Sequence, residues 1–178
     1  KKLFVRLGYE PLQNSIKANN RKLSLALIWL TSFIVYRAAD VILVTSPDIF
    51  NFIVGKYLVI KQKIKVKSNW VNTQLFNNDD SKANSVFTVL YVGRLSPEKN
   101  IDLLLNSCFD LNLKVIIIGK GPEEYNLKKL ACQLNLDVDF CGIIANDNLI
   151  SFYNQCDLFC LPSSYEGSLK SLIEAMSC

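Results

Sequence analysis

Short apolar runs alternate with helical segments along most of this chain, and that order restricts the folds it can adopt. We predict strands at residues 41–45, 64–68, 88–92, 114–118, 137–141 and 157–161. Helices are predicted between them, at about residues 47–55, 101–110, 123–135 and 146–155. Strand–helix alternation of this kind produces βαβ units, in which parallel strands form a doubly wound sheet. The sequence therefore predicts an α/β protein.

The helix expected at 47–55 has a well-defined start, because Ser46 can cap it and Pro47 suits its first position. Residues 69–85 show little periodicity and are rich in Asn, Asp and Ser, which is typical of a linker. We place a domain boundary near Asn72, giving domains at residues 1–72 and 73–178.

The charge balance changes sign at the same boundary. Residues 1–67 hold twelve Lys and Arg against three Asp and Glu, a net charge of +9. Residues 68–178 hold eight against thirteen, a net charge of −5. A basic first half favours an anionic partner, either a membrane surface or a phosphorylated substrate. A solvated basic face without a partner is the alternative. The basic residues are scattered and not interleaved with aromatics, which argues against nucleic acid.

Residues 23–36 are nearly all apolar and are flanked by Arg21, Lys22 and Arg37. A membrane-spanning helix needs about 20 residues, so this stretch is too short. We predict a helix buried in the core. The alternative is a helix in the membrane interface, with its basic flanks near lipid headgroups.

The six cysteines do not indicate a metal site. The chain has no His and no C-x-x-C pair, so this segment offers no Cys/His zinc site. Cys141, Cys156 and Cys160 lie in or beside the predicted strands, where we expect them to act as small buried hydrophobes. Unpaired, buried cysteines suit a reducing, cytoplasmic environment. We also expect a piece of a longer protein, because no initiator Met is present and the last helix stops at Cys178.

Charged side chains follow the predicted strands of the second domain. Arg94 and Lys99 come after the strand at 88–92, in a loop that leads into a helix. Fixed positive charge beside free helix amides is typical of an anion site, most often for phosphate. The loops after three parallel strands converge on one edge of the sheet. We therefore expect this loop, the one at residues 119–122 and the one with Glu166 to meet there.

Glu166 and Glu174 lie eight positions apart, one in a loop and one on the helix that follows. Carboxylates accept strong hydrogen bonds from adjacent hydroxyls, so sugars and riboses are the candidate ligands. A dinucleotide fingerprint is excluded because its third Gly position holds Glu124, and no P-loop motif occurs. Pro122 is expected to be the first residue of the next helix.

The second domain resembles a known family. The stretches that carry the resemblance are VLYVGRLSPEKNIDLLL, VIIIGKGPEEYNLKKLA and VDFCGIIANDNLISFYNQCDLFCLPSSYEGSLKSLIEAMSC. In order, they are similar to the C-terminal donor domain of family 4 (group 1) retaining glycosyltransferases. The resemblance covers residues 86–178 almost continuously. A weaker resemblance, to the end of the acceptor domain and the hinge, is carried by ADVILVTSPDIFNFI and KIKVKSNWVNTQLF. The family resemblance implies the GT-B fold, with two Rossmann-like domains that are both truncated here.

The resemblance also implies roles for individual residues. Arg94 and Lys99 would hold the diphosphate of a nucleotide sugar, Glu174 would receive the ribose hydroxyls, and Glu166 would lie against the transferred sugar. The backbone amides of Gly167, Ser168 and Leu169 would face that sugar or the phosphate, and Ile144 would lie beside the nucleobase. Family members need no divalent metal for transfer.

The implied reaction moves a sugar from a nucleoside-diphosphate sugar to a lipid-linked or glycan acceptor, with retention of anomeric configuration. The unpaired cysteines favour the cytoplasm as its location, and the basic first half favours the inner face of the cell membrane. The chain alone should be inactive. The alternatives are an epimerase or a phosphorylase on the same fold, or a catalytically silent GT-B partner subunit.

Simple electrostatics agrees with this scheme. The departing nucleoside diphosphate gains negative charge that Arg94 and Lys99 can stabilise. An oxocarbenium-like anomeric carbon favours a nearby carboxylate such as Glu166. The scheme requires the two cations and the two acids to lie together at the rim of the sheet and outside the core. Leu169 stands where the family usually has Pro or Gly. Lys170 is expected either to contact an acidic group on a substrate or to be solvated.

Overall fold

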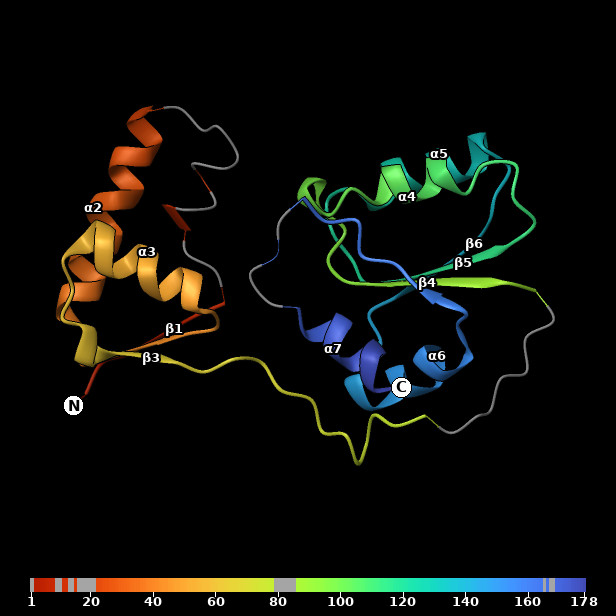
Figure 1. Ribbon diagram of the computed structural model, residues 1–178. Coiled ribbons are helices and arrows are strands. Elements are labelled where there is room, and N and C mark those ends of the chain that lie inside the picture. Colours follow the sequence, from red (N-terminus) through yellow and green to blue (C-terminus); the bar gives the residue numbers. More distant parts are fainter. Residues whose placement is uncertain are drawn as a thin grey trace. The chain divides into compact units, whose positions relative to one another are not determined.

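The computed structural model in Figure 1 describes residues 2–8, 11–12, 15, 22–78, 86–164, 166 and 169–178. The chain divides into two compact units. The first comprises Lys1–Asn69 and Glu166–Ser168, and the second comprises Trp70–Tyr165 and Leu169–Cys178. Both units are α/β, with parallel strands in each.

The first unit contains a three-stranded parallel sheet in the order β1-β2-β3. Its elements are β1 (Phe4–Leu7), α2 (Lys22–Ala38), β2 (Val41–Val44), α3 (Pro47–Tyr57), the 3-10 helix η1 (Lys61–Lys63) and β3 (Ile64–Val66). One hydrophobic cluster joins both helices to the sheet, around the buried side chains of Tyr36, Ile42, Ile53 and Tyr57.

Helix α3 begins where the sequence predicts. Ser46 is the N-cap, and its hydroxyl oxygen accepts a hydrogen bond from the backbone N–H of Ile49 at 3.3 Å. Pro47 occupies the first turn, where its missing N–H costs nothing. The helix continues to Tyr57, two residues beyond the expected end, and Leu58 in the left-handed conformation (φ 52°) terminates it.

The prediction of a buried helix holds for only one face of α2. Tyr36 is buried, and Trp29 stacks on Phe33 with ring centroids 5.1 Å apart. The side chains of another face are exposed and also apolar, namely Leu27, Leu30, Ile34 and Val35. Periodicity did not reveal this, because a helix that is apolar all round has no distinct polar face. In the described part of the chain, no helix has the length and apolarity needed to cross a membrane.

The second unit is built on a four-stranded parallel sheet in the order β6-β5-β4-β7. Its elements are β4 (Thr88–Val92), η2 (Pro97–Lys99), α4 (Ile101–Ser107), β5 (Lys114–Ile118), α5 (Glu124–Gln133), β6 (Asp137–Gly142), η3 (Asn146–Asn148), α6 (Leu149–Gln155), β7 (Leu158–Phe159) and α7 (Lys170–Ser177). The bounds of β4 and β5 agree with the prediction.

Strand β7 is shorter than the five residues predicted. Its two residues pair with Val89 and Leu90 of β4. Backbone hydrogen bonds from Asp157 to Thr88 (2.9 Å) and from Cys160 to Leu90 (2.9 Å) extend the contact by about one residue at each end. The apolar run is therefore placed correctly, but only its centre has strand geometry.

Helices cover both faces of the second sheet (Figure 1). Val89 and Tyr91 of β4 pack in a cluster with α4 and α5, while Leu90 and Val92 pack in another with α6. Every residue of β4 is buried, which explains its continuous apolar sequence, since a central parallel strand has no solvent face. The loops that follow its strands are consequently held on a rigid base.

Candidate functional site

The loops after β4 and β5 lie side by side at the carboxyl end of the sheet. The backbone N–H of Gly93 donates to the carbonyl of Ile118 (2.9 Å), and that of Leu95 donates to the carbonyl of Lys120 (3.1 Å). The N–H of Glu123 donates back to the carbonyl of Leu95 at 3.1 Å. These bonds fix the backbone on both sides of Arg94.

Two glycines make this close approach possible. A Cβ atom on Gly119 would overlap the backbone of Gly93, and one on Gly121 would overlap the backbone of Leu95. Gly119 also has a φ of +139°, which side chains disfavour. The prediction that Pro122 starts the next helix is wrong by two residues, because α5 begins at Glu124. The turn at residues 119–122 packs against Leu95 and does not form part of α5.

The loop after β7 is tied to the same place. The side-chain amide of Asn100 donates to the carbonyl of Pro162 (3.0 Å) and to the hydroxyl of Ser164 (2.7 Å). The N–H of Ser164 donates to the carbonyl of Glu98 at 3.0 Å. The loops after β4, β5 and β7 thus meet at one end of the sheet, as the parallel arrangement predicts.

The loop after β4 presents both expected cations. Arg94 is exposed, and its guanidinium makes no hydrogen bond or ion pair with any described residue. Its backbone carbonyl accepts a hydrogen bond from the hydroxyl of Tyr91 at 3.0 Å. Lys99 is half-buried at the end of η2. The positions of the two residues fit an anion site.

One acid lies between the two cations in the sequence. The hydroxyl of Ser96 donates to the carboxylate of Glu98 at 2.6 Å. This hydrogen bond holds the pKa of Glu98 below its usual value, and the nearby charges of Lys99 and Arg94 lower it further. Glu98 is therefore ionised at neutral pH. The hydrogen bond from Ser96 holds its carboxylate against the loop after β4.

Glu174 is buried, contrary to the expectation that all four charged side chains lie outside the core. It is 2 % exposed, although it belongs to an eight-residue helix with exposed neighbours. Its Oε2 accepts a hydrogen bond from the hydroxyl of Tyr153 at 3.1 Å. Burial raises the pKa of Tyr153, and the charge of Glu174 raises it further, so this phenol keeps its proton and donates.

The second oxygen of Glu174 is less well satisfied. Oε1 lies 3.2 Å from the ammonium of Lys170, within ion-pair distance. It is nevertheless buried and receives no well-directed hydrogen bond from the described residues. A buried acceptor without a directed donor costs free energy, so this oxygen has capacity for a hydroxyl of a ligand.

Lys170 is exposed, as expected of a solvated lysine, and it also contacts two residues of the second unit. Its ammonium donates to the side-chain oxygen of Asn146 at 3.1 Å and pairs with Glu174 on the next turn of α7. These two contacts orient the ammonium, although the side chain is 54 % exposed. The i,i+4 spacing of Lys170 and Glu174 was the sequence signal for this pair, whereas nothing in the sequence indicated Asn146.

For the other predicted site residues, the structure gives the position in the chain and the degree of burial. Ile144 follows β6, is half-buried and packs on the cluster around α6. Leu169 immediately precedes α7 and is exposed. Glu166 is half-buried in the segment between β7 and α7, and its position beside the transferred sugar stays a prediction. Gly167 and Ser168 lie outside the described residues.

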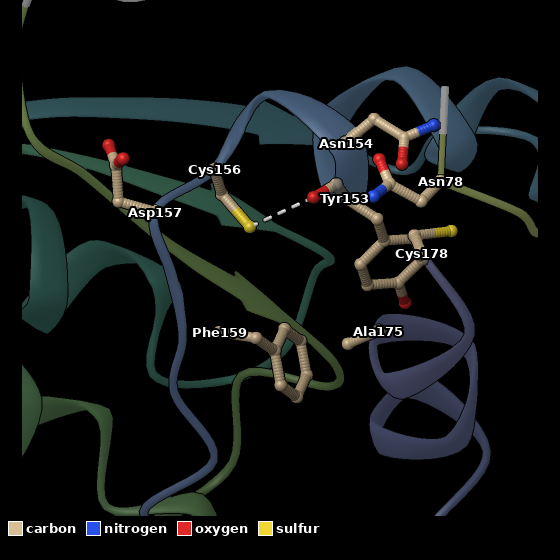
Figure 2. A pocket seen from close by; sticks show the side chains of 8 residues that line it. All are labelled: Asn78, Tyr153, Asn154, Cys156, Asp157, Phe159, Ala175 and Cys178. Atoms are coloured by element: carbon tan, nitrogen blue, oxygen red, sulfur yellow. Dashed lines mark hydrogen bonds between the residues drawn. The ribbon is translucent and has the colours of Figure 1, made fainter. Parts of the chain in front are cut away.

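A cavity of about 560 Å³ opens elsewhere on the second unit (Figure 2). It is lined by Asn78, Tyr153, Asn154, Cys156, Asp157, Phe159, Ala175 and Cys178. Asp157 directly precedes β7, so the cavity begins at the amino end of that strand. Neither cation of the β4 loop lines it, nor does Glu174. We therefore assign the candidate site to the three loops.

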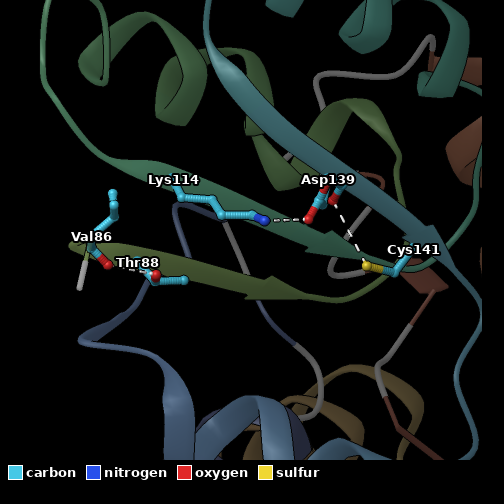
Figure 3. A network of polar contacts seen from close by, with 5 residues as sticks. All are labelled: Val86, Thr88, Lys114, Asp139 and Cys141. Carbon is cyan, nitrogen blue, oxygen red and sulfur yellow. Dashed lines mark hydrogen bonds and ion pairs between the residues drawn. The ribbon is translucent and has the colours of Figure 1, made fainter. Parts of the chain in front are cut away.

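A polar network on β5 and β6 has a structural explanation (Figure 3). Lys114, the first residue of β5, pairs with Asp139 at 2.7 Å, and the hydrogen bond raises the pKa of Lys114. Outward charges on β6, an edge strand of the described sheet, discourage pairing with another chain. Cys141 is on this outward face and is exposed, so its predicted burial is wrong. Cys156 and Cys160 are partly buried.

Sequence reasoning missed Asn100 and Tyr153. Asn100 adopts a left-handed conformation (φ 47°) just before the helix at residues 101–107. Asn tolerates this conformation better than most residues do, so an Asn at this position was the available sequence signal. Tyr153 gave no comparable signal, because an aromatic residue in an apolar helix is usually part of the core.

Comparison with known proteins shows the family. The profile described as "Glycosyl transferases group 1" matches residues 72–178. An uncharacterized glycosyltransferase of Haemophilus influenzae is 40 % identical over 114 residues, which cover 60 % of this chain and 31 % of the relative.

A second relative, from Campylobacter jejuni, is 27 % identical over 150 residues, covering 82 % of this chain and 41 % of its own. It is named N-acetylgalactosamine-N,N'-diacetylbacillosaminyl-diphospho-undecaprenol 4-alpha-N-acetylgalactosaminyltransferase. This chain therefore spans about a third to two fifths of the length of these relatives.

Among solved structures, Anabaena HepE in complex with UDP-glucose superimposes with a TM-score of 0.78 at 19 % identity. The match covers 100 % of this chain and 51 % of HepE. At this identity the likeness concerns the fold, which is the GT-B fold that the family resemblance implied.

Proposed function

Since this chain belongs to the group 1 glycosyl transferases, we propose that the protein transfers a sugar from a nucleoside-diphosphate sugar to a glycan or lipid-linked acceptor. The observation that carries the proposal is the joining of three loops at one end of the second sheet. Hydrogen bonds among the loops after β4, β5 and β7 hold Arg94 and Lys99 at that end. A nucleoside diphosphate is an anion of suitable chemistry for the two cations.

The proposed roles of the cations follow from the charge of the leaving group. Breaking the bond between the anomeric carbon and the diphosphate oxygen leaves negative charge on the nucleoside diphosphate. Arg94 supplies a planar fork to that charge and Lys99 a point charge. Such fixed, preorganised charges lower the barrier without a metal ion. Transfer should therefore continue in the presence of a chelator.

Glu174 is proposed to bind the ribose. Its Oε1 has an unused acceptor position, while Tyr153 fixes the orientation of the carboxylate through Oε2. Ribose hydroxyls that donate to Oε1 would share this oxygen with Lys170, or displace its ammonium. Burial makes such a bond stronger than it is in water. The cost of the unsatisfied oxygen would be recovered on binding.

The remaining roles rest on family membership. We assign Glu166 and the amides of Gly167, Ser168 and Leu169 to the transferred sugar, and Ile144 to the nucleobase. The anomeric configuration is proposed to be retained. In this scheme residues 73–178 belong to the donor domain, and residues 1–72 form the C-terminal part of the acceptor domain.

The proposed location is the cytoplasmic face of a membrane. The C. jejuni relative is named for a diphospho-undecaprenol substrate, and a lipid-linked acceptor requires contact with a bilayer. Helix α2 offers exposed apolar side chains, and its unit is strongly basic. An apolar face combined with basic charge favours the interface of an anionic membrane.

The test is an assay of nucleoside diphosphate release by the whole protein, with UDP-, GDP- and ADP-sugars, with and without glycan and polyprenyl-diphosphate acceptors. We expect one nucleotide class to be used, release to depend on the acceptor, and the rate to survive EDTA. Release that is independent of acceptor would favour hydrolysis or epimerisation. The absence of both release and binding with every donor would favour the silent subunit.

A further inference from the structure

We propose that Asn100 is a positioning residue, which couples the diphosphate-binding loop to the segment that carries Glu166. The inference rests on the proposed function and adds a residue to it. Asn100 directly follows Lys99 and precedes α4, so it belongs to the loop after β4. Its side chain crosses to the loop after β7 and makes two hydrogen bonds there.

The backbone of Asn100 allows this side chain to reach across. Its φ of 47° and ψ of 42° are left-handed, a conformation that Gly and Asn adopt most readily. Glycine would satisfy the backbone at this position but would make no contact with the other loop. The presence of Asn therefore adds a function that the backbone alone does not require.

The contacts use the full donor capacity of the amide. One N–H of Nδ2 can go to the carbonyl of Pro162 (3.0 Å) and the other to the hydroxyl of Ser164 (2.7 Å). A third bond, from the N–H of Ser164 to the carbonyl of Glu98, runs parallel to them (3.0 Å). Residues on both sides of Lys99 are thus bonded to Pro162 and Ser164.

Ser164 precedes Glu166 by two residues in the chain. Ser164 is thus a fixed point from which the chain continues toward Glu166, the residue proposed to lie against the transferred sugar. Misplacement of a reacting group by about 1 Å can reduce a rate about a hundredfold. Loss of the Asn100 contacts should therefore affect the chemical step more than the affinity for the nucleoside diphosphate, which other side chains hold.

The test compares Asn100→Gly with Asn135→Gly in the whole protein. Asn135 has nearly the same left-handed φ (51°) but lies after α5, away from the three loops. Both changes keep the backbone conformation and remove an amide. We expect Asn100→Gly to lower kcat about ten- to a hundredfold, with the Kd of the nucleoside diphosphate changed less than about threefold. Asn135→Gly should match the wild type.

Coupling to Ser164 distinguishes positioning from a general loss of stability. Ser164→Ala should lower kcat in the wild type and have little further effect in the Asn100→Gly background, since the shared contact is already gone. Independent, additive effects of the two changes would overturn the proposal. So would equal kcat values for Asn100→Gly and Asn135→Gly.

A readout without substrate separates this proposal from the proposed function. Hydrogen exchange at the amide of Ser164 should be faster in Asn100→Gly than in Asn135→Gly and the wild type, because the parallel bond to Glu98 loses its support. If the wild type turns over no donor, the proposed function fails. The hydrogen-exchange measurement then still decides whether Asn100 links the two loops. Unchanged exchange at Ser164 would overturn the link.

Discussion

Glu174 was expected outside the core, and the structure shows it buried. The sequence correctly indicated a carboxylate more than one turn into the helix that follows the last strand. It did not indicate burial, because spacing gives a position on a helix and not what packs against that position. Its partner Tyr153 belongs to α6, and its partner Lys170 lies one turn earlier on α7 itself.

The first prediction concerns this carboxylate. Glu174→Ala should weaken binding of the nucleoside diphosphate about ten- to a hundredfold, since hydrogen bonds to charged groups contribute about 1.5–3 kcal/mol. Calorimetric titration measures the change. Glu124→Ala is the control, because it removes a carboxylate that is 29 % exposed and pairs with Lys128 at the surface (2.7 Å), and surface pairs contribute little. Equal affinity of the Glu174→Ala variant and the wild type would count against the assignment.

A second prediction at this scale concerns Gly121. A Cβ there would overlap the backbone of Leu95, so Gly121→Ala should displace the loop that carries Arg94. We expect the free energy of unfolding to fall by about 1–3 kcal/mol, the usual cost of overpacking, and nucleotide affinity to fall with it. Denaturant unfolding measures the first effect and titration the second.

Gly55→Ala serves as the matched control for that change. Gly55 lies within α3, and a Cβ at this position would have open space around it. The substitution should therefore stabilise the protein by roughly 0.5–1 kcal/mol, because Ala is the better helix former. A neutral Gly121→Ala would mean that the two loops can separate without consequence, contrary to the geometry described.

At the scale of elements, most strands and helices could be predicted from the sequence. Strands β4 and β5 were predicted residue by residue because they are short apolar runs bounded by polar turns. The end of α4 was set three residues too late, and the start of α5 too early. These boundaries depend on contacts between loops, such as that of Gly121 with Leu95, which local sequence does not encode.

Helix α2 is an element whose environment could not be predicted. Its apolar side chains point both into the core and outward, and a pattern that is apolar all round cannot distinguish the two faces. The exposed face leads to a prediction about membranes. Leu27→Asp and Ile34→Asp, at positions 64 % and 59 % exposed, should reduce binding to vesicles that contain anionic lipid, measured by sedimentation.

The control for the membrane prediction is Leu111→Asp, which changes a similarly exposed leucine (55 %) in the second unit. Binding should fall several-fold for the two α2 variants at constant salt and remain unchanged for the control, because a carboxylate in the interface is costly. Equal binding of all three variants would show that α2 does not contact the lipid.

At the scale of the whole molecule, the fold class and the convergence of the three loops could be predicted, because parallel βαβ units bring strand ends to one edge. The side-chain links between those loops could not, since Asn100 and Ser164 are 64 residues apart. Roles of Glu166 and of Ile144 come from family membership. The central claim is therefore that the β4 loop, held by its neighbours, binds a nucleoside diphosphate.

The most direct test is calorimetric titration of UDP, GDP and ADP into the whole protein in EDTA, compared with the Arg94→Ala/Lys99→Ala double variant. We predict that the wild type binds one of the three and that the double variant binds it at least about tenfold more weakly, since two charge-assisted contacts are lost. Lys128→Ala/Lys129→Ala, with the same loss of charge on α5, should bind as the wild type does. Undiminished affinity in the Arg94→Ala/Lys99→Ala variant would contradict the account.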